Sequence, residues 1–261
     1  MNLVKKIFLK PHIVFTSYFF DFWEMVKKWR GLYYLFVNAS EYNSKNKTAF
    51  RITFKDLYYR SYDRFSSAGS VPAHYFLQDI WAAHFIYSNS IKQVVDVGSR
   101  LDGYISHLLP FCLVTFIDIR PLDLEIHNLK VVTGSITNLP FTNDSIKFLS
   151  SLHVIEHIGL GRYGDQVDPL GHLSAAKELS RVLAPGGTLI LSTVVGNERL
   201  CFDAHRIFDP ATVLSIFDEL KLEQFCLIDD KGEHVIENAT IELGRACNYG
   251  CGIFIFKKPG T

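Results

Sequence analysis

The stretch from residue 93 to residue 118 constrains the fold more than any other part of this 261-residue chain. Gln93–Val97 is a short β-branched run that stops at Gly98, which is typical of a buried parallel strand entering a tight turn. Residues 104–109 carry helical apolar spacing, and a second apolar run ends at Asp118. A strand, a glycine turn, a helix and a strand that ends in a carboxylate form the half-unit that holds an adenosine.

The spacing of the glycines distinguishes two kinds of nucleotide site. A dinucleotide site has three closely spaced glycines where the pyrophosphate meets a helix N-terminus. Here Gly98 and Gly103 are predicted to bracket the turn, and the four residues between them fit a pyrophosphate badly. The stretch therefore favours an adenosine ligand of another type.

Motifs further along the chain indicate which type. Asp96-Val-Gly98 is followed by L-P-F at 139–141, H-V-I-E-H at 153–157 and R-V-L-A-P-G-G-T-L-I-L at 181–191. In this order, over residues 72–209, they resemble class I methyltransferases, which bind S-adenosylmethionine. The run HVIEHIGLGRYGD at 153–165 resembles one uncharacterised methyltransferase-like family within that class.

The resemblance implies an α/β, Rossmann-like class I methyltransferase sandwich in residues 72–261, behind a helical, aromatic N-terminal extension in residues 1–71. Its sheet would have about seven strands, mostly parallel, with an antiparallel final strand. Apolar runs predict the later strands at 130–133, 146–152, 188–194, 222–228 and 251–256, and helical spacing predicts helices at 73–88 and 210–220. Residues 40–47 read as a polar loop, and residues 229–250 are long enough to carry their own small structure.

The same resemblance implies S-adenosylmethionine as the cofactor and assigns residues to it. Asp118 would accept hydrogen bonds from the ribose hydroxyls, and His153 would lie near the methionine sulfur. Arg100 and Ser135 depart from the family pattern. The helix at 73–88 would cap the pocket, with His74, Tyr75, Gln78 and Asp79 as candidate contacts. The predicted cofactor residues are Asp96, Gly98, Ser99, Arg100, Gly103, Asp118, Ile119, Arg120, Ser135, Ile136 and His153.

Histidines and charged residues after the fourth predicted strand are the candidates for chemistry. Imidazole has an unperturbed pKa of about 6.5, which suits it to take a proton from a hydroxyl acceptor. No N-P-P-Y tetrad is present, which disfavours methylation of bases or protein amides. We therefore expect O-methylation of a small-molecule or glycan-linked hydroxyl. The catalytic candidates are His157, Glu156, His205, Arg162, Tyr163 and Asp165.

Two other functions stay open at this point. A methyltransferase-like module that has lost its cofactor would bind a glycan or a protein partner. A metal-dependent hydrolase would use His153, His157 and His205, because H-x-x-E-H also occurs in inverted zinc peptidases. That motif needs a helix, whereas here a strand leads into it and glycines follow, so we expect no metal.

The charge and the cysteine content indicate which partners and which cell compartment are favoured. The formal net charge is +0, which does not predict a nucleic-acid partner. Five irregularly spaced cysteines suit the reducing cytoplasm, and Cys247 and Cys251 lack the second pair that a zinc site needs.

The N-terminal segment has two interpretations. Residues 12–23 are aromatic and lie between lysines, so they form either a helix packed on the domain or on a second subunit, or an interfacial helix. The first predicts a possible homodimer, and the second predicts peripheral contact with the inner face of a membrane.

Overall fold

The structure is a computed structural model that describes residues 22–58, 73–120, 122–123, 125–202 and 204–260. The chain divides into two compact units, Met1–Ser70 and Val71–Thr261. Residues 1–21 lie outside the described residues, so both interpretations of the N-terminal segment stay predictions. Among the helices of the described ranges, none is both long and apolar enough to cross a membrane.

The described part of the first unit contains helix α3 (Phe22–Lys45) and a short 3-10 helix, η1 (Phe54–Asp56). The predicted polar loop at 40–47 was wrong, because α3 continues to Lys45. Asn43 uses its polar side chain to hold the chain that returns past the helix end: its amide donates to the Ile52 carbonyl at 2.8 Å, and its oxygen accepts from the Ile52 N–H at 2.9 Å.

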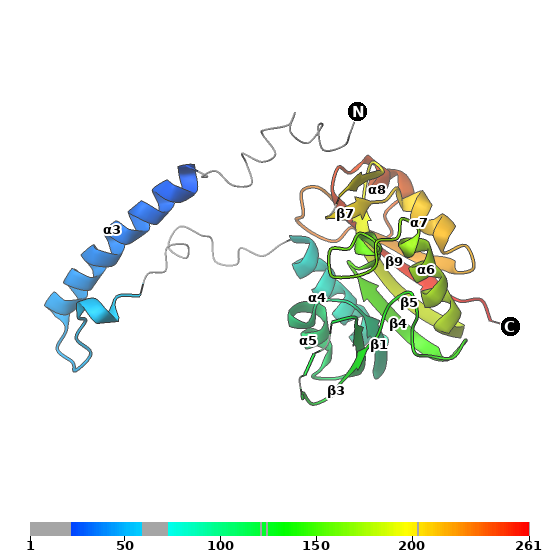
Figure 1. The fold of residues 1–261 in the computed structure, drawn as a ribbon, viewed down its shortest axis with the longest axis horizontal. Helices are drawn as coiled ribbons and strands as arrows, with labels where there is room; N and C mark the ends of the chain where they lie inside the picture. Colours follow the sequence, from blue (N-terminus) through cyan, green and yellow to red (C-terminus); the bar gives the residue numbers. More distant parts are fainter. Residues whose placement is uncertain (1–21, 59–72, 121, 124, 203, 261) are drawn as a thin grey trace. The chain divides into compact units, whose positions relative to one another are not determined.

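The second unit is built on a seven-stranded sheet with the order β3-β2-β1-β4-β5-β9-β8 (Figure 1). Its first five strands in this order are parallel, and β9 runs antiparallel to both β5 and β8, which confirms the predicted fold class. The strands are β1 (Gln93–Val97), β2 (Leu113–Asp118), β3 (Leu129–Thr133), β4 (Ile146–Leu152), β5 (Leu183–Val195), β8 (Lys221–Ile228) and β9 (Gly250–Lys257).

Helices cover both faces of this sheet, with α4 and α5 on one face and α6 and α7 on the other (Figure 1). Alternation along β9 shows why both faces need cover: Ile253 and Ile255 pack with α4, whereas Phe254 and Phe256 pack with α6. The helices are α4 (Ala73–Ser88), α5 (Ser106–Leu108), α6 (Gly171–Val182), α7 (Pro210–Ile216) and α8 (Ile241–Ala246), and α8 supplies the small structure expected in residues 229–250.

Three local features differ from the sequence prediction. The helix after β1 begins earlier than expected, as a π-helix, η3 (Leu101–Ile105), so Gly103 lies inside it instead of closing the turn. A Cβ at Gly103 would stand 2.2 Å from Asp79 Oδ2, so this glycine permits close packing against α4. Strand β5 starts five residues before the predicted residue 188, and a small hairpin, β6 (Arg199–Cys201) and β7 (His205–Ile207), was not predicted.

Truncating a core aromatic tests the packing of the sheet. Phe254 is fully buried, and its ring centroid lies 4.7 Å from that of Phe225. Phe254→Ala should lower the free energy of unfolding by about 3–5 kcal/mol, because it removes apolar burial and leaves a cavity. Phe202, which is 70% exposed, provides the control, and Phe202→Ala should change stability by less than about 0.5 kcal/mol. Urea unfolding followed by circular dichroism measures both, and equal losses would contradict the packing described.

Candidate active site

A pocket of about 560 Å³ lies at the carboxyl ends of β1, β2 and β4. This is the edge at which open α/β sheets bind their ligands. Most of the predicted site residues meet there. Those that line the pocket are Gly98, Ser99, Arg100, Asp118, Ile119, Arg120, Ile136, His153, His157, Tyr163 and Asp165.

Asp96, which is fully buried, stabilises the turn after β1 by hydrogen bonds. Its carboxylate accepts hydrogen bonds from the Ser99 N–H (3.1 Å), the Ser99 hydroxyl (2.7 Å) and the Ser150 hydroxyl (2.6 Å). Burial raises the pKa of Asp96 to about 7, although these donors pull the pKa down. Asp96 therefore shapes the turn and does not itself line the pocket.

Gly98 gives this turn its backbone conformation. Its φ is +74°, in the left-handed region, and a Cβ there would lie 3.0 Å from Val154 Cγ1. A side chain at this position would be strained and would crowd the residue that follows His153. The glycine therefore brings bare backbone to the pocket wall, as a closely bound ligand requires.

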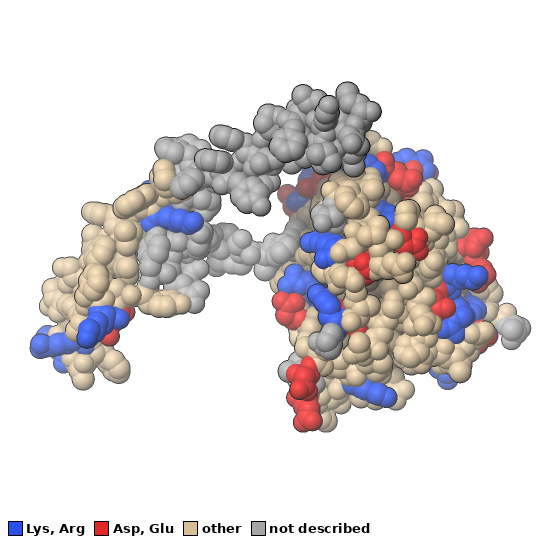
Figure 2. Space-filling model, viewed as in Figure 1, with Lys and Arg blue, Asp and Glu red and all other residues tan. Residues whose placement is uncertain are grey.

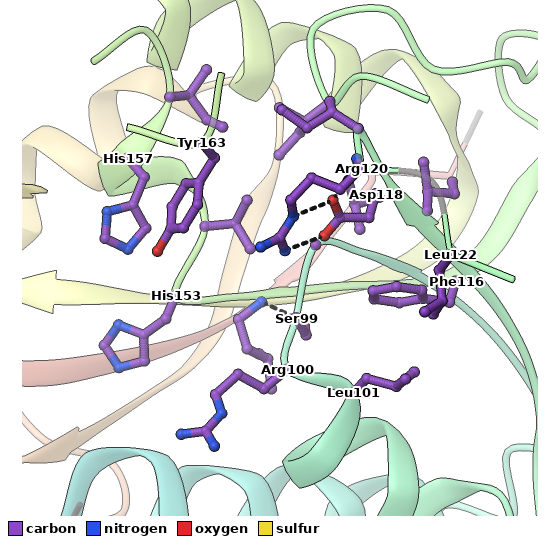
Figure 3. A pocket seen from close by; sticks show the side chains of 18 of the residues that line it. Ser99, Arg100, Leu101, Phe116, Asp118, Arg120, Leu122, His153, His157 and Tyr163 are labelled. Carbon is purple, nitrogen blue, oxygen red and sulfur yellow. Dashed lines mark hydrogen bonds and ion pairs between the residues drawn. The ribbon is translucent and has the colours of Figure 1, made fainter. Parts of the chain in front are cut away.

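Asp118 ends β2 beside the same turn, and its side chain is 9% exposed. Arg120 binds both of its carboxylate oxygens: Nε donates to Oδ1 at 2.9 Å and Nη2 donates to Oδ2 at 2.7 Å (Figure 3). Burial works to raise the pKa of Asp118, but the hydrogen bonds from Arg120 lower it below its usual value. Asp118 is therefore an ionised carboxylate that lines the pocket.

A buried histidine–glutamate pair lies at the opposite wall, where His153 lines the pocket and Glu156 lies behind it. His153 Nδ1 is 2.6 Å from Glu156 Oε1, and Thr193 donates to the other oxygen of Glu156 at 3.1 Å. His153 has a φ of +54°, a strained conformation that functional sites often contain. Burial opposes a charged imidazole, but Cys251 and the Glu156 carboxylate raise the pKa of His153 well above its usual value. Glu156 thus holds the orientation of the His153 ring and favours its charged form.

His157 ends η4 (Ile155–His157), at the start of the long loop that leads to α6. Its Nδ1 is 2.7 Å from the Ala204 carbonyl oxygen, to which Arg162 also donates at 3.0 Å. Because a carbonyl only accepts, Nδ1 carries the proton of a neutral His157, and Nε2 keeps a lone pair. The Tyr163 ring stands edge-on to this imidazole, with the centroids 5.4 Å apart.

Six predicted residues are not pocket residues. Asp96 and Glu156 lie buried behind the wall, and Gly103 is inside η3. Ser135 turns its hydroxyl toward Thr137, at 2.9 Å. Arg162 and His205 lie outside the pocket lining. Arg162 contacts the ring of Tyr163, and His205 contacts the ring of His157.

The structure adds residues, in the pocket wall and beside it, to the predicted cofactor and catalytic sets. Tyr75, on α4, was one of four candidates on its helix and is the one that lines the cavity. Phe116 and Leu122 add apolar wall, and nothing in their local pattern marks them. Tyr249 packs against His74 and His205 at ring-centroid distances of 5.3 and 5.4 Å, a cluster that only the fold brings together.

No group of three or more histidine, cysteine, aspartate or glutamate side chains suited to a metal ion occurs in the described part of the chain. Cys251 is buried, and its thiol donates to Gln78 Oε1 at 3.4 Å. Of the H-x-x-E-H run, only Ile155–His157 is helical, as the single 3-10 turn η4, so the run does not form the helix on which an inverted zinc peptidase places its ligands.

Comparison with families and curated proteins identifies no relative of known activity. A family model described as "Caenorhabditis protein of unknown function, DUF268" matches residues 122–229, which is less than half of the chain. No curated protein matches the sequence.

Solved structures share the fold at low sequence identity. The crystal structure of the [4+2]-cyclase SpnF superposes with a TM-score of 0.51 and 13% identity, over 69% of this chain and 82% of that chain. The N-methyltransferase NodS from Bradyrhizobium japonicum WM9, in complex with S-adenosyl-l-homocysteine, gives 0.47 and 15%, over 70% and 84%. A SAM-dependent methyltransferase from Methanosarcina mazei gives 0.47 and 16%, over 67% and 98%. Together with the sheet order, the similarity to SpnF shows a Rossmann-like fold.

Removing the charge of Glu156 tests the buried pair. Glu156→Gln keeps the shape of the side chain but removes the carboxylate that favours the imidazolium, so the pKa of His153 should fall. Titration of the histidine ring signals by NMR measures this. The control is Glu242→Gln, in the first turn of α8, which should leave the pKa of His153 unchanged. An unchanged pKa in Glu156→Gln would mean that Glu156 does not hold the charge.

Proposed function

We propose that this chain is an S-adenosylmethionine-dependent methyltransferase that methylates a hydroxyl on a small molecule or on a glycan-linked sugar. The observation that carries the proposal is a single pocket at the carboxyl ends of β1, β2 and β4 that is lined by both the Gly98 turn and the Asp118 carboxylate. A buried carboxylate is stable when donors reach it, and the two ribose hydroxyls of an adenosine match in number the two side-chain donors that Arg120 now provides to Asp118.

The other residues of the pocket fit the same ligand. Phe116, Leu122 and Ile136 offer apolar surface to a flat base, and Gly98 leaves the backbone open to close approach. The bound cofactor would supply an electrophilic methyl group on a sulfonium. The protein has to hold the acceptor in line with that group and exclude water.

Methylation of a hydroxyl releases a proton, and His157 is the residue we assign to accept it. Its Nδ1 is committed to the Ala204 carbonyl, so the lone pair on Nε2 is available, and the residue lines the pocket. His153 is less suited to the role, because its Nδ1 is bound to the Glu156 carboxylate, which raises the pKa of the imidazole.

The acceptor side would be formed by the loop after η4. Tyr163 and Asp165 line the pocket, and Asp165 holds the loop by accepting from the Gly159 N–H at 2.7 Å. Acidic and basic side chains are interspersed over the face that Figure 2 shows, which is consistent with the net charge of +0 and favours a small or sugar-like acceptor over a polyanion.

Cofactor binding tests the proposal directly. Calorimetric titration of the full chain with S-adenosylmethionine and S-adenosylhomocysteine should show binding of both. Asp118→Ala should weaken each by about 1–3 kcal/mol, because it removes two hydrogen bonds to the ribose. Asp218→Ala, at an exposed position, is the control and should bind like the wild type. If the wild type binds neither compound while folded, the methyltransferase proposal fails.

Replacing the assigned base separates chemistry from binding. His157→Gln should lower kcat by about 10²–10⁴-fold, the range typical of a lost general base. Affinity for S-adenosylhomocysteine should stay within about twofold, since the imidazole is not assigned to hold the cofactor. Transfer of labelled methyl to a panel of sugars and nucleotide sugars provides the assay, with His84→Ala, on the exposed side of α4, as the control. Parallel losses of kcat and affinity would assign His157 a structural role.

A second candidate function is a methyltransferase-like module that binds a glycan or a protein without the cofactor. The observation that favours it is the double hydrogen bond from Arg120, which satisfies both oxygens of Asp118. The same titration separates the two, because such a module would bind neither compound.

A further inference from the structure

The carboxylate at the end of β2 already has partners. Asp118 Oδ1 accepts from the backbone N–H of Arg120 at 2.8 Å and from its Nε at 2.9 Å, and Oδ2 accepts from its Nη2 at 2.7 Å. A guanidinium edge presents two parallel N–H donors to the two carboxylate oxygens. The vicinal hydroxyls of a ribose present two O–H donors to the same atoms.

The two members of this pair differ in burial. The side chain of Asp118 is 9% exposed and that of Arg120 is 60% exposed. The carboxylate is therefore fixed in the pocket, whereas the guanidinium can move into solvent without burying charge elsewhere. Because the Arg120 end of the pair is open to solvent, the pair adds only modest stability, and exchange of Arg120 for a neutral donor pair costs little free energy.

Arg120 also reaches the acceptor side of the pocket. Its Cζ lies 5.2 Å from the centre of the Tyr163 ring, and Figure 3 shows the guanidinium between Asp118 and Tyr163. Arg162 lies 5.1 Å from the same ring, and the ring stands beside His157. One arginine side chain, that of Arg120, thus contacts both the Asp118 carboxylate and Tyr163 of the loop after η4.

We propose that Arg120 is an internal competitor for the ribose subsite: it binds Asp118 until a ligand with two neighbouring hydroxyls displaces it, and it thereby sets the affinity of the pocket for the nucleoside. This inference rests on the proposed function for the identity of the ligand. Displacement moves Arg120 away from the position it shares with Tyr163, so nucleoside binding reorganises the acceptor side as well.

The Arg120 backbone makes a clean test possible. Its N–H continues to donate to Asp118 Oδ1 after the side chain is removed, so the carboxylate keeps its orientation. Arg120→Ala should bind S-adenosylhomocysteine about three- to tenfold more tightly than the wild type, the range expected for a lost ion pair that competed with the ligand. Arg120→Gln, which removes the charge but keeps a polar side chain, should also bind more tightly.

Salt supplies a readout that a structural role would not change. Raising NaCl from about 50 to about 500 mM screens the exposed guanidinium, so wild-type affinity for S-adenosylhomocysteine should increase. The affinity of Arg120→Ala should not increase with salt. The control is Arg245→Ala, which removes another exposed arginine–aspartate pair, Arg245 with Asp209 at 2.6 Å, outside the pocket. Its affinity and salt response should match those of the wild type.

Each outcome of these titrations supports or overturns the role of Arg120 as a competitor. Tighter binding by both Arg120 variants, with loss of the salt response, supports the competitor. Wild-type binding together with equal or weaker binding by Arg120→Ala overturns the competitor and leaves the proposed function intact. Binding by the variants but not by the wild type supports a competitor strong enough to close the site. Binding by none of the folded proteins overturns both proposals.

Discussion

The buried carboxylate of Asp96 is the interaction on which the geometry of the pocket depends. It receives the backbone and the hydroxyl of Ser99, which shape the turn after β1, and the hydroxyl of Ser150 on β4. Ser99 Oγ in turn accepts from the Leu152 N–H at 2.9 Å, one residue before His153. The turn after β1 and the start of the loop after β4 are therefore fixed by one fully satisfied network, and losing the carboxylate would leave several buried donors unpaired.

From this network the pocket extends in two directions with different physical character. Toward β2 it is built on strand ends, where the Gly98 backbone and Asp118 are held by the sheet. Toward the acceptor it is built on the loop that follows β4, where Asp165 and Tyr163 depend on local hydrogen bonds and ring contacts. The first part suits a constant ligand and the second suits variation in chemistry. The superposition on SpnF, a [4+2]-cyclase, agrees with the view that the fold alone does not specify the reaction.

The sequence predicted the sheet well and side-chain partnerships poorly, for identifiable reasons. Short β-branched runs bounded by glycine or a carboxylate are typical of buried strands, so β1 and β2 were predicted at their observed positions. Gly103 was misplaced because its role is to let η3 approach α4, and such a tertiary contact leaves no local mark. Asp118 and Arg120 were each predicted to meet the cofactor, but only side-chain geometry shows that they bind each other. The ring contact of His74 with Tyr249 could not be predicted either, because the two residues lie at opposite ends of the domain's sequence.

The two proposals together have the pocket at the ends of β1, β2 and β4 hold an adenosine whose ribose takes the place of Arg120 on Asp118. A crystal structure of the full chain grown with S-adenosylhomocysteine tests it most directly. In such a crystal both ribose hydroxyls should donate to the Asp118 carboxylate, with the Arg120 guanidinium turned away and the Gly98 backbone against the ligand. A ligand bound elsewhere, or one bound in the pocket while Arg120 still holds both oxygens of Asp118, would contradict it.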